Sequence, residues 1–245
     1  MKNSNTIRVV VITIVLLFCN SLIAEKAGSA TVSAGRTYYS AKTIYRLCKG
    51  QPGDGSWPSF QIEEERKEYC TAYIVAVAEA YTDWKAKGDW SFCLPDDISR
   101  ENLVKVVYSF MQNRMKAKKL TGISVISHAL ADAYPCEQPE SPRQLGLMSM
   151  SELYSKCGGG TSAEFSNSFC TGYLEGVADA YSNWDIKGDS KARFCVDPYE
   201  IDLNEFAINI RALIDTLGFF GETNTALNIV VNVYLEQFPC VSQTE

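Results

Sequence analysis

The chain of 245 residues contains a single histidine, His128, and no Cys-x-x-Cys pair. Nucleophilic catalysis usually needs a base beside the nucleophile, most often a histidine, and structural zinc sites combine closely spaced cysteines and histidines. His128 falls inside a predicted helix between Ser127 and Ala129, where a structural or surface role is the simpler interpretation. The sequence therefore predicts a protein that is not an enzyme and that has no cofactor and no metal site.

An excess of basic residues is also lacking, since 23 Lys and Arg face 29 Asp and Glu and the net charge is −6. Nucleic acids and anionic lipid surfaces attract clustered Lys and Arg side chains. The charge balance therefore argues against a nucleic-acid partner. It favours either a basic protein partner or simply the solubility of an exported protein.

The sequence offers no run of roughly 20 apolar residues, the length that a membrane-spanning helix needs. The apolar segment at residues 9–18 follows Lys2 and Arg8, and small residues follow between Ala24 and Ala30. This order is typical of a secretory signal peptide. We expect cleavage after Ala24, or as late as Ala30, and hence an exported protein without stable membrane insertion after cleavage.

Nine cysteines are present, and Cys19 lies in the expected signal peptide. The other eight are an even number in an exported chain, which indicates disulfides rather than metal ligands or a catalytic thiolate. They divide four to each half of the chain: Cys48, Cys70, Cys93 and Cys136, then Cys157, Cys170, Cys195 and Cys240.

A long internal repeat organises the sequence. CTAYIVAVAEAYTDWKAKGD at residues 70–89 returns as CTGYLEGVADAYSNWDIKGD at residues 170–189, with eleven of twenty positions identical. A Phe-Cys pair and a Pro-Cys pair follow both copies. The repeat predicts two tandem modules, at residues 38–136 and 148–240, joined by a short linker that contains two prolines.

Four segments of each module carry apolar residues at steps of three and four, the pattern of amphipathic helices. In the second helix of each module a line of small residues accompanies the apolar stripe. Residues this small let a neighbouring backbone approach closely, so we expect this helix to be the central one. Strand signals are weak throughout, and the predicted class is all-α. The small residues are Ala72, Ala76 and Ala80 in the first module and Gly172, Gly176 and Ala180 in the second.

The order of the helices also predicts the disulfide pairing, because the ends of two antiparallel helices meet near the turn. One cysteine ends the first helix and the next opens the second, and another two flank the third and fourth helices. Each bridge is expected to stabilise its module by roughly 2 to 4 kcal/mol. The predicted pairs are Cys48 with Cys70, Cys93 with Cys136, Cys157 with Cys170, and Cys195 with Cys240.

Acidic residues at helical spacing are the one polar feature with a pattern. Glu79 and Asp83 lie in the second helix of the first module, and Glu175 and Asp179 lie in that of the second. A solvated outer face is the default interpretation, and an acid/base pair is a further alternative. A third interpretation is an acidic surface that docks a basic protein, which makes these four the candidate partner-binding residues.

The sequence resembles the Rap/Tai family of immunity proteins. The resemblance rests on CTGYLEGVADAY, RFC and FPC in the second module and on CTAYIVAVAEAY, FCLP and AYPC in the first. It covers most of both modules, although Ala72 and Ala76 replace two glycines of the pattern. Typical members hold one module, so a tandem departs from the family. The residues that carry the pattern best are Cys170, Gly172, Tyr173, Gly176, Asp179 and Tyr181.

The resemblance implies an exported helical protein that resides in the periplasm of Gram-negative bacteria. There it would protect the cell from a peptidoglycan amidase delivered by type VI secretion, by blocking the active-site cleft of this papain-like enzyme. Since family members are often dimeric, two modules in one chain would form an internal pseudo-dimer. The alternative is a periplasmic scaffold or chaperone-like helical protein of unrelated role, because a fold does not fix a function.

Overall fold

Eight α-helices form the regular structure of the described residues, which come from a computed structural model. The helices confirm the predicted all-α class, with four of them in each half of the chain. Within the parts described, none is long and apolar enough to cross a membrane. The described residues are 39–52, 62–83, 92–114, 119–136, 146–158, 167–182, 194–196, 201–217 and 225–239, and the expected signal peptide lies outside them.

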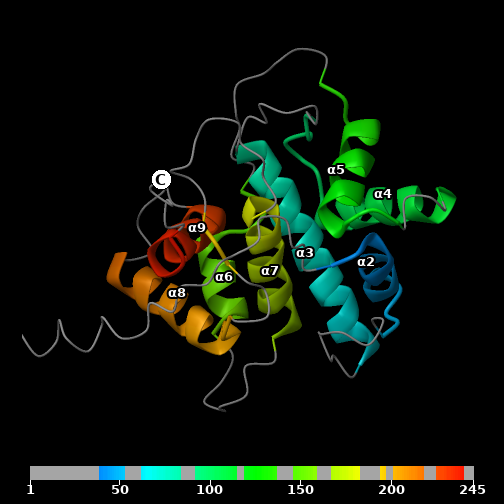
Figure 1. Cartoon of the computed structure of the whole chain (residues 1–245). Helices are drawn as coiled ribbons and strands as arrows, with labels where there is room; N and C mark the ends of the chain where they lie inside the picture. Colours follow the sequence, from blue (N-terminus) through cyan, green and yellow to red (C-terminus); the bar gives the residue numbers. More distant parts are fainter. Residues whose placement is uncertain are drawn as a thin grey trace, which may run out of the picture. The chain divides into compact units, whose positions relative to one another are not determined.

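The first half comprises α2 to α5 and the second half α6 to α9 (Figure 1). In the first half the helices are α2 (Ala41–Cys48), α3 (Glu63–Asp83), α4 (Arg100–Asn113) and α5 (Gly122–Ala133). In the second half they are α6 (Met150–Lys156), α7 (Ser168–Ser182), α8 (Leu203–Leu217) and α9 (Ala226–Gln237).

Side-chain caps fix where most of these helices begin. A serine or threonine oxygen accepts a hydrogen bond from the backbone N–H three residues later, which satisfies a donor that the first helical turn leaves unpaired. At α7 the side-chain oxygen of Asn167 accepts from the N–H groups of Phe169 and Cys170, at 3.0 and 3.1 Å. The hydroxyl caps are Ser40, Ser99, Thr121, Ser149 and Thr225.

Disulfides tie the helices of each half together. The structure contains three of the predicted bridges, Cys48–Cys70, Cys93–Cys136 and Cys157–Cys170. Cys195 is also disulfide-bonded, and its predicted partner Cys240 lies outside the described residues.

The third cysteine of each half forms the same backbone contact. The Cys93 N–H donates to the carbonyl oxygen of Tyr134 at 2.9 Å, and the Cys195 N–H donates to that of Phe238 at 2.8 Å. An isolated β-bridge accompanies each contact. In both halves, therefore, the segment before the third helix pairs with the chain that leaves the fourth.

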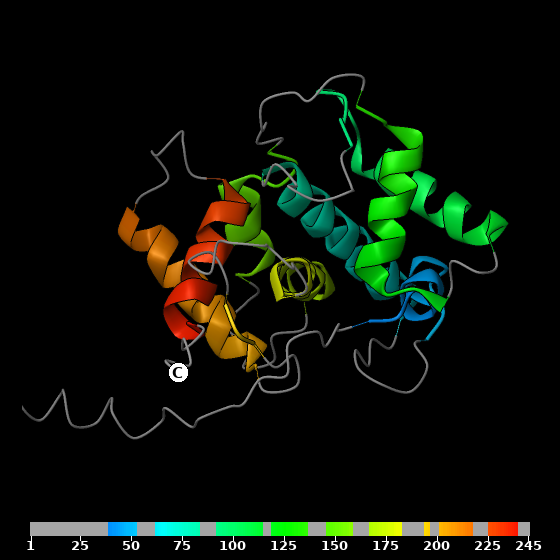
Figure 2. The same cartoon turned by 45° about the horizontal axis from the view of Figure 1, so that its top comes forward.

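Helices α3 and α7 lie side by side at the centre (Figures 1 and 2). Helices α2, α4 and α5 pack on α3, while α6 and α9 pack on α7 and α8 packs on both of these. Nearly every described side chain from Tyr69 to Ala80 and from Ser168 to Tyr181 is buried. We expected these two helices to be amphipathic, but over these residues they are buried on all sides and have no solvent face.

Candidate functional site

The two central helices approach each other closely where the repeat places its small residues. A Cβ added at Gly176 would lie 2.7 Å from the Ala76 Cβ and 2.8 Å from the Tyr73 carbonyl oxygen, and one at Gly172 would collide with the backbone of Tyr69. Only glycine leaves room for this contact. The expectation of a central, closely packed helix is thus confirmed, and the neighbour is the matching helix of the other half.

The helices run parallel, because the contacts advance along both in the same direction. Gly172 faces Tyr69, and four residues later Gly176 faces Tyr73. Parallel helices that meet through matching residues have the arrangement of a two-fold interface, in which each side offers the same patch to the other.

Two tyrosine–carboxylate hydrogen bonds cross this contact reciprocally. The Tyr73 hydroxyl donates to Asp179, and the Tyr173 hydroxyl donates to Glu79 at 2.5 Å. The two tyrosines hold matching positions in the repeat, and so do the two acids. All four side chains are buried. Each half therefore supplies the donor for the other half's carboxylate.

Glu175 adds a third link that only one half provides, since Val75 holds the matching position. It is buried and accepts from the hydroxyls of Tyr39, at 3.0 Å, and Tyr69. The Tyr39 ring packs edge-on against the rings of Tyr69 and Tyr73, both at 5.8 Å between centroids. Burial, and next the negative charge of Glu175, raise the pKa of the Tyr39 and Tyr69 hydroxyls well above 10. These tyrosines stay protonated and act as donors.

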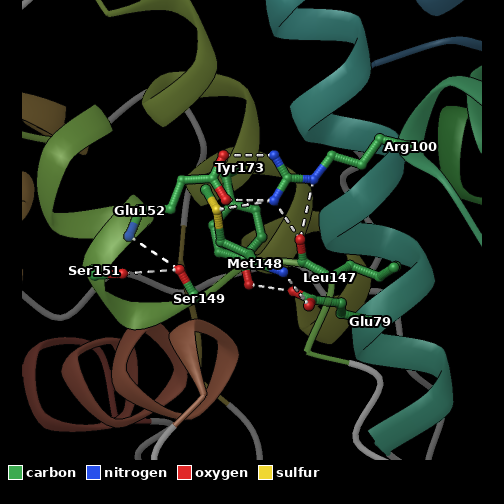
Figure 3. A network of polar contacts seen from close by, with 8 residues as sticks. All are labelled: Glu79, Arg100, Leu147, Met148, Ser149, Ser151, Glu152 and Tyr173. Atoms are coloured by element: carbon green, nitrogen blue, oxygen red, sulfur yellow. Dashed lines mark hydrogen bonds and ion pairs between the residues drawn. The ribbon is translucent and has the colours of Figure 1, made fainter. Parts of the chain in front are cut away.

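Glu79 is a carboxylate whose ionisation the fold alters. Its other oxygen accepts from the backbone N–H of Met148 at 2.8 Å, just before α6 (Figure 3). Burial raises the pKa of this carboxyl to about 7, and the hydrogen bonds from Tyr173 and Met148 and the charge of Arg100 only partly offset the effect. Glu79 is therefore a buried group that titrates near neutral pH.

Arg100 forms a second connection between the halves, at the edge of this network (Figure 3). From the start of α4 its guanidinium forms a two-pronged ion pair with Glu152 of α6, at 2.5 Å, and also donates to the carbonyl oxygen of Leu147. The hydrogen bond from Arg100 lowers the pKa of the Glu152 carboxyl. The side chains of the pair are 24% and 32% exposed, so solvent weakens its contribution.

The structure corrects the expected location of the candidate partner-binding residues. Glu79, Glu175 and Asp179 are 3%, 1% and 0% exposed, so the prediction of a solvated acidic face is wrong for these three. The physical reason is that tyrosine hydroxyls from across the α3–α7 contact satisfy carboxylates that would otherwise need water. Asp83 lies at the last position of α3, and its side chain is outside the described part of the structure.

The sequence did not lead us to expect the tyrosine donors of this network or Arg100 as site residues. The repeat did contain a signal, because Tyr73 recurs as Tyr173 and Glu79 recurs as Asp179 within otherwise apolar runs. An acid kept in an apolar run needs a buried partner, and a tyrosine kept at a second position supplies a donor.

The network holds the helices together, and its groups are already engaged with one another. His128, the one candidate base, stands apart on α5, where burial and the charge of Arg114 lower its pKa. Among the described residues, no three His, Cys, Asp or Glu side chains gather in a way that could hold a metal ion.

No curated protein matches the chain. The family model described as Rap1a immunity proteins matches residues 40–136, which span the first half from the cap of α2 to the last cysteine. This segment of the chain is therefore similar to the Rap1a immunity proteins.

Proposed function

We propose that the protein is a periplasmic immunity protein that binds a peptidoglycan amidase delivered by type VI secretion and blocks its active site. The observation that carries this proposal is the family match over residues 40–136. Immunity proteins act by binding an effector, so the proposed activity is inhibition without catalysis.

The chemistry of the described residues supports a binding role. The buried carboxylates are engaged by tyrosine hydroxyls and a backbone N–H, which is how a rigid core is built rather than how a general acid or base is presented to a substrate. Disulfides further stiffen each half. A rigid surface loses little conformational freedom on binding, which favours tight association.

Export supports the same assignment, since the substrate of a cell-wall amidase lies outside the cytoplasmic membrane. The expected signal peptide would carry the chain to that compartment, where disulfides form. Because the proposed function needs both export and disulfide formation, it is best tested in living cells.

The test is protection of a sensitive bacterium in which amidase effectors from a panel are directed one at a time to the periplasm. The full chain should restore growth against at least one amidase, and the purified pair should co-elute with loss of peptidoglycan hydrolysis. A chain lacking residues 1–24 is the control, and it should not protect. Protection only against effectors of another enzyme class would correct the target, and absence of any protection and any complex would refute the proposal.

A further inference from the structure

An open groove lies on the surface of the first half, between α2, α3 and α4. Its volume is about 480 Å³. The Cys48–Cys70 disulfide, Thr71 and Val104 line its apolar part, and these side chains are at least partly buried. The groove is distinct from the buried tyrosine–carboxylate network.

Three lysines surround the groove, on three different helices or helix ends. They are Lys49 after α2, Lys67 on α3 and Lys105 on α4, and all three side chains are exposed. Glu101 is the one acidic residue of the lining. Lys67 also pairs with Glu63, one turn earlier on α3, but that pair is largely exposed and therefore weak. The groove is thus a basic site on a chain whose net charge is −6.

An aromatic wall gives the groove a defined shape. Tyr108 lines it and stacks on Tyr45, with 5.2 Å between ring centroids and an angle of 3° between the planes. The Lys49 ammonium lies 5.6 Å from the centroid of the Tyr45 ring. Stacked rings restrict each other's motion, so one lysine is placed against a fixed surface rather than moving freely in solvent.

The second half does not repeat the groove's three lysines. Superposing the caps and buried positions of α8 on those of α4 places Ile208 at the position of Lys105 and Arg211 at that of Tyr108. Gly158 and Asn167 stand where the first half has its other two lysines. Ile208 is 64% exposed, so this position remains on the surface with its charge removed. The lysines are therefore a property of the first half alone and not of the helical framework.

We infer that this groove binds an acidic segment of the effector, with an Asp or Glu side chain seated among the three lysines and against Tyr108. The inference rests on the proposed function and identifies the part of the surface that performs it. Charge complementarity selects the occupant, since three lysine ammonium groups around one groove favour a carboxylate and the apolar part of the lining favours an apolar loop around it. The same complementarity steers association and makes it sensitive to salt.

The test uses the full mature chain and the amidase that it binds in the protection screen. Lys49→Glu with Lys105→Glu reverses two of the groove's charges, and Lys42→Glu with Lys119→Glu makes the same change in net charge at exposed lysines of the same half that do not line the groove. All four positions are exposed, and circular dichroism and thermal melting confirm that each variant is folded. Affinity is then measured by calorimetry at two salt concentrations.

We expect the groove variant to bind at least about tenfold more weakly than the unmodified chain, and the control to bind within about twofold, because the reversed charges repel a carboxylate in the groove. The salt dependence should also fall in the groove variant. Equal affinities of the two variants, whether both unchanged or both reduced, would overturn the groove assignment while the immunity function stands. If the unmodified chain itself binds no amidase, the proposed function fails, and the groove assignment fails with it.

Discussion

Replacement of Glu79 by Gln should make the protein more stable at pH 8 and should leave it little changed at pH 5. Glu79 is 3% exposed, and its folded-state pKa of about 7 stands above an ordinary value of 4.5. Between these values the unfolded chain binds fewer protons than the folded one, so stability falls as the pH rises through this window. The stabilising contribution of the neutral acid is complete below about pH 4.5 and is lost by about pH 7.

The magnitude follows from the interval between the two pKa values. Ionisation of Glu79 lowers the free energy of unfolding by about 3 kcal/mol at pH 8 and by less than about 1 kcal/mol at pH 5. Gln preserves the contacts of the protonated acid. Its amide oxygen can accept from the Met148 N–H, and its amide nitrogen can donate to the Tyr173 hydroxyl oxygen, which also has acceptor capacity.

The assay is urea unfolding of the oxidised protein at pH 5, 6, 7 and 8, with the free energy of unfolding extrapolated to water. The control is Glu64→Gln in the exposed first turn of α3, which removes the same charge outside the interior and should shift all four values alike. A difference between wild type and Glu79→Gln that is the same at pH 5 and pH 8 would refute the reasoning, because it would show that Glu79 does not titrate in this range.

Three further predictions concern the contact between the halves. Gly176→Ala should lower the free energy of unfolding by about 2 kcal/mol through overpacking, and adding Ala76→Gly should recover part of the loss in the same urea assay; no loss would mean that the helices can separate freely. Tyr173→Phe should cost about 1–3 kcal/mol at pH 8 by removing a hydrogen bond from a buried acid, and the midpoint of the pH-dependent stability change should move upward; an unmoved midpoint would contradict the hydrogen bond. A double-mutant cycle of Arg100→Ala and Glu152→Ala should give a coupling energy of about 0.5–1 kcal/mol, as expected for a partly exposed pair, and a value of zero would show that the pair adds nothing to stability.

The helices were predictable because their signals are local. A hydroxyl cap followed by apolar residues at steps of three and four needs no information from elsewhere in the chain, and α4, α5 and α9 begin at Ser99, Thr121 and Thr225 in this way. The pairing of the cysteines was equally accessible, since it depends only on which helix ends meet in an antiparallel pair.

The burial of the acidic residues could not be predicted from the local sequence. Glu79 and its donor Tyr173 are 94 positions apart, and Asp179 and Tyr73 are 106 apart. Seen on a single helix, an acid at helical spacing is expected to face water. The glycines and alanines did indicate a close neighbour, but nothing within one helix says that the neighbour is the matching helix of the other half, with a tyrosine aimed at each acid.

The core contacts join the two halves reciprocally, whereas the groove's lysines belong to the first half alone. Tyr73 and Tyr173 each donate to an acid of the opposite half. A substitution at one of these positions therefore disrupts a hydrogen bond of the other half as well. The groove carries no such constraint, because Lys105 of the first half and Ile208 of the second are both exposed. Fused halves can therefore keep a reciprocal core while one surface changes alone. If the lysine groove is where the effector binds, the second half contributes by holding α3 in place, and a single binding surface per chain is the consequence.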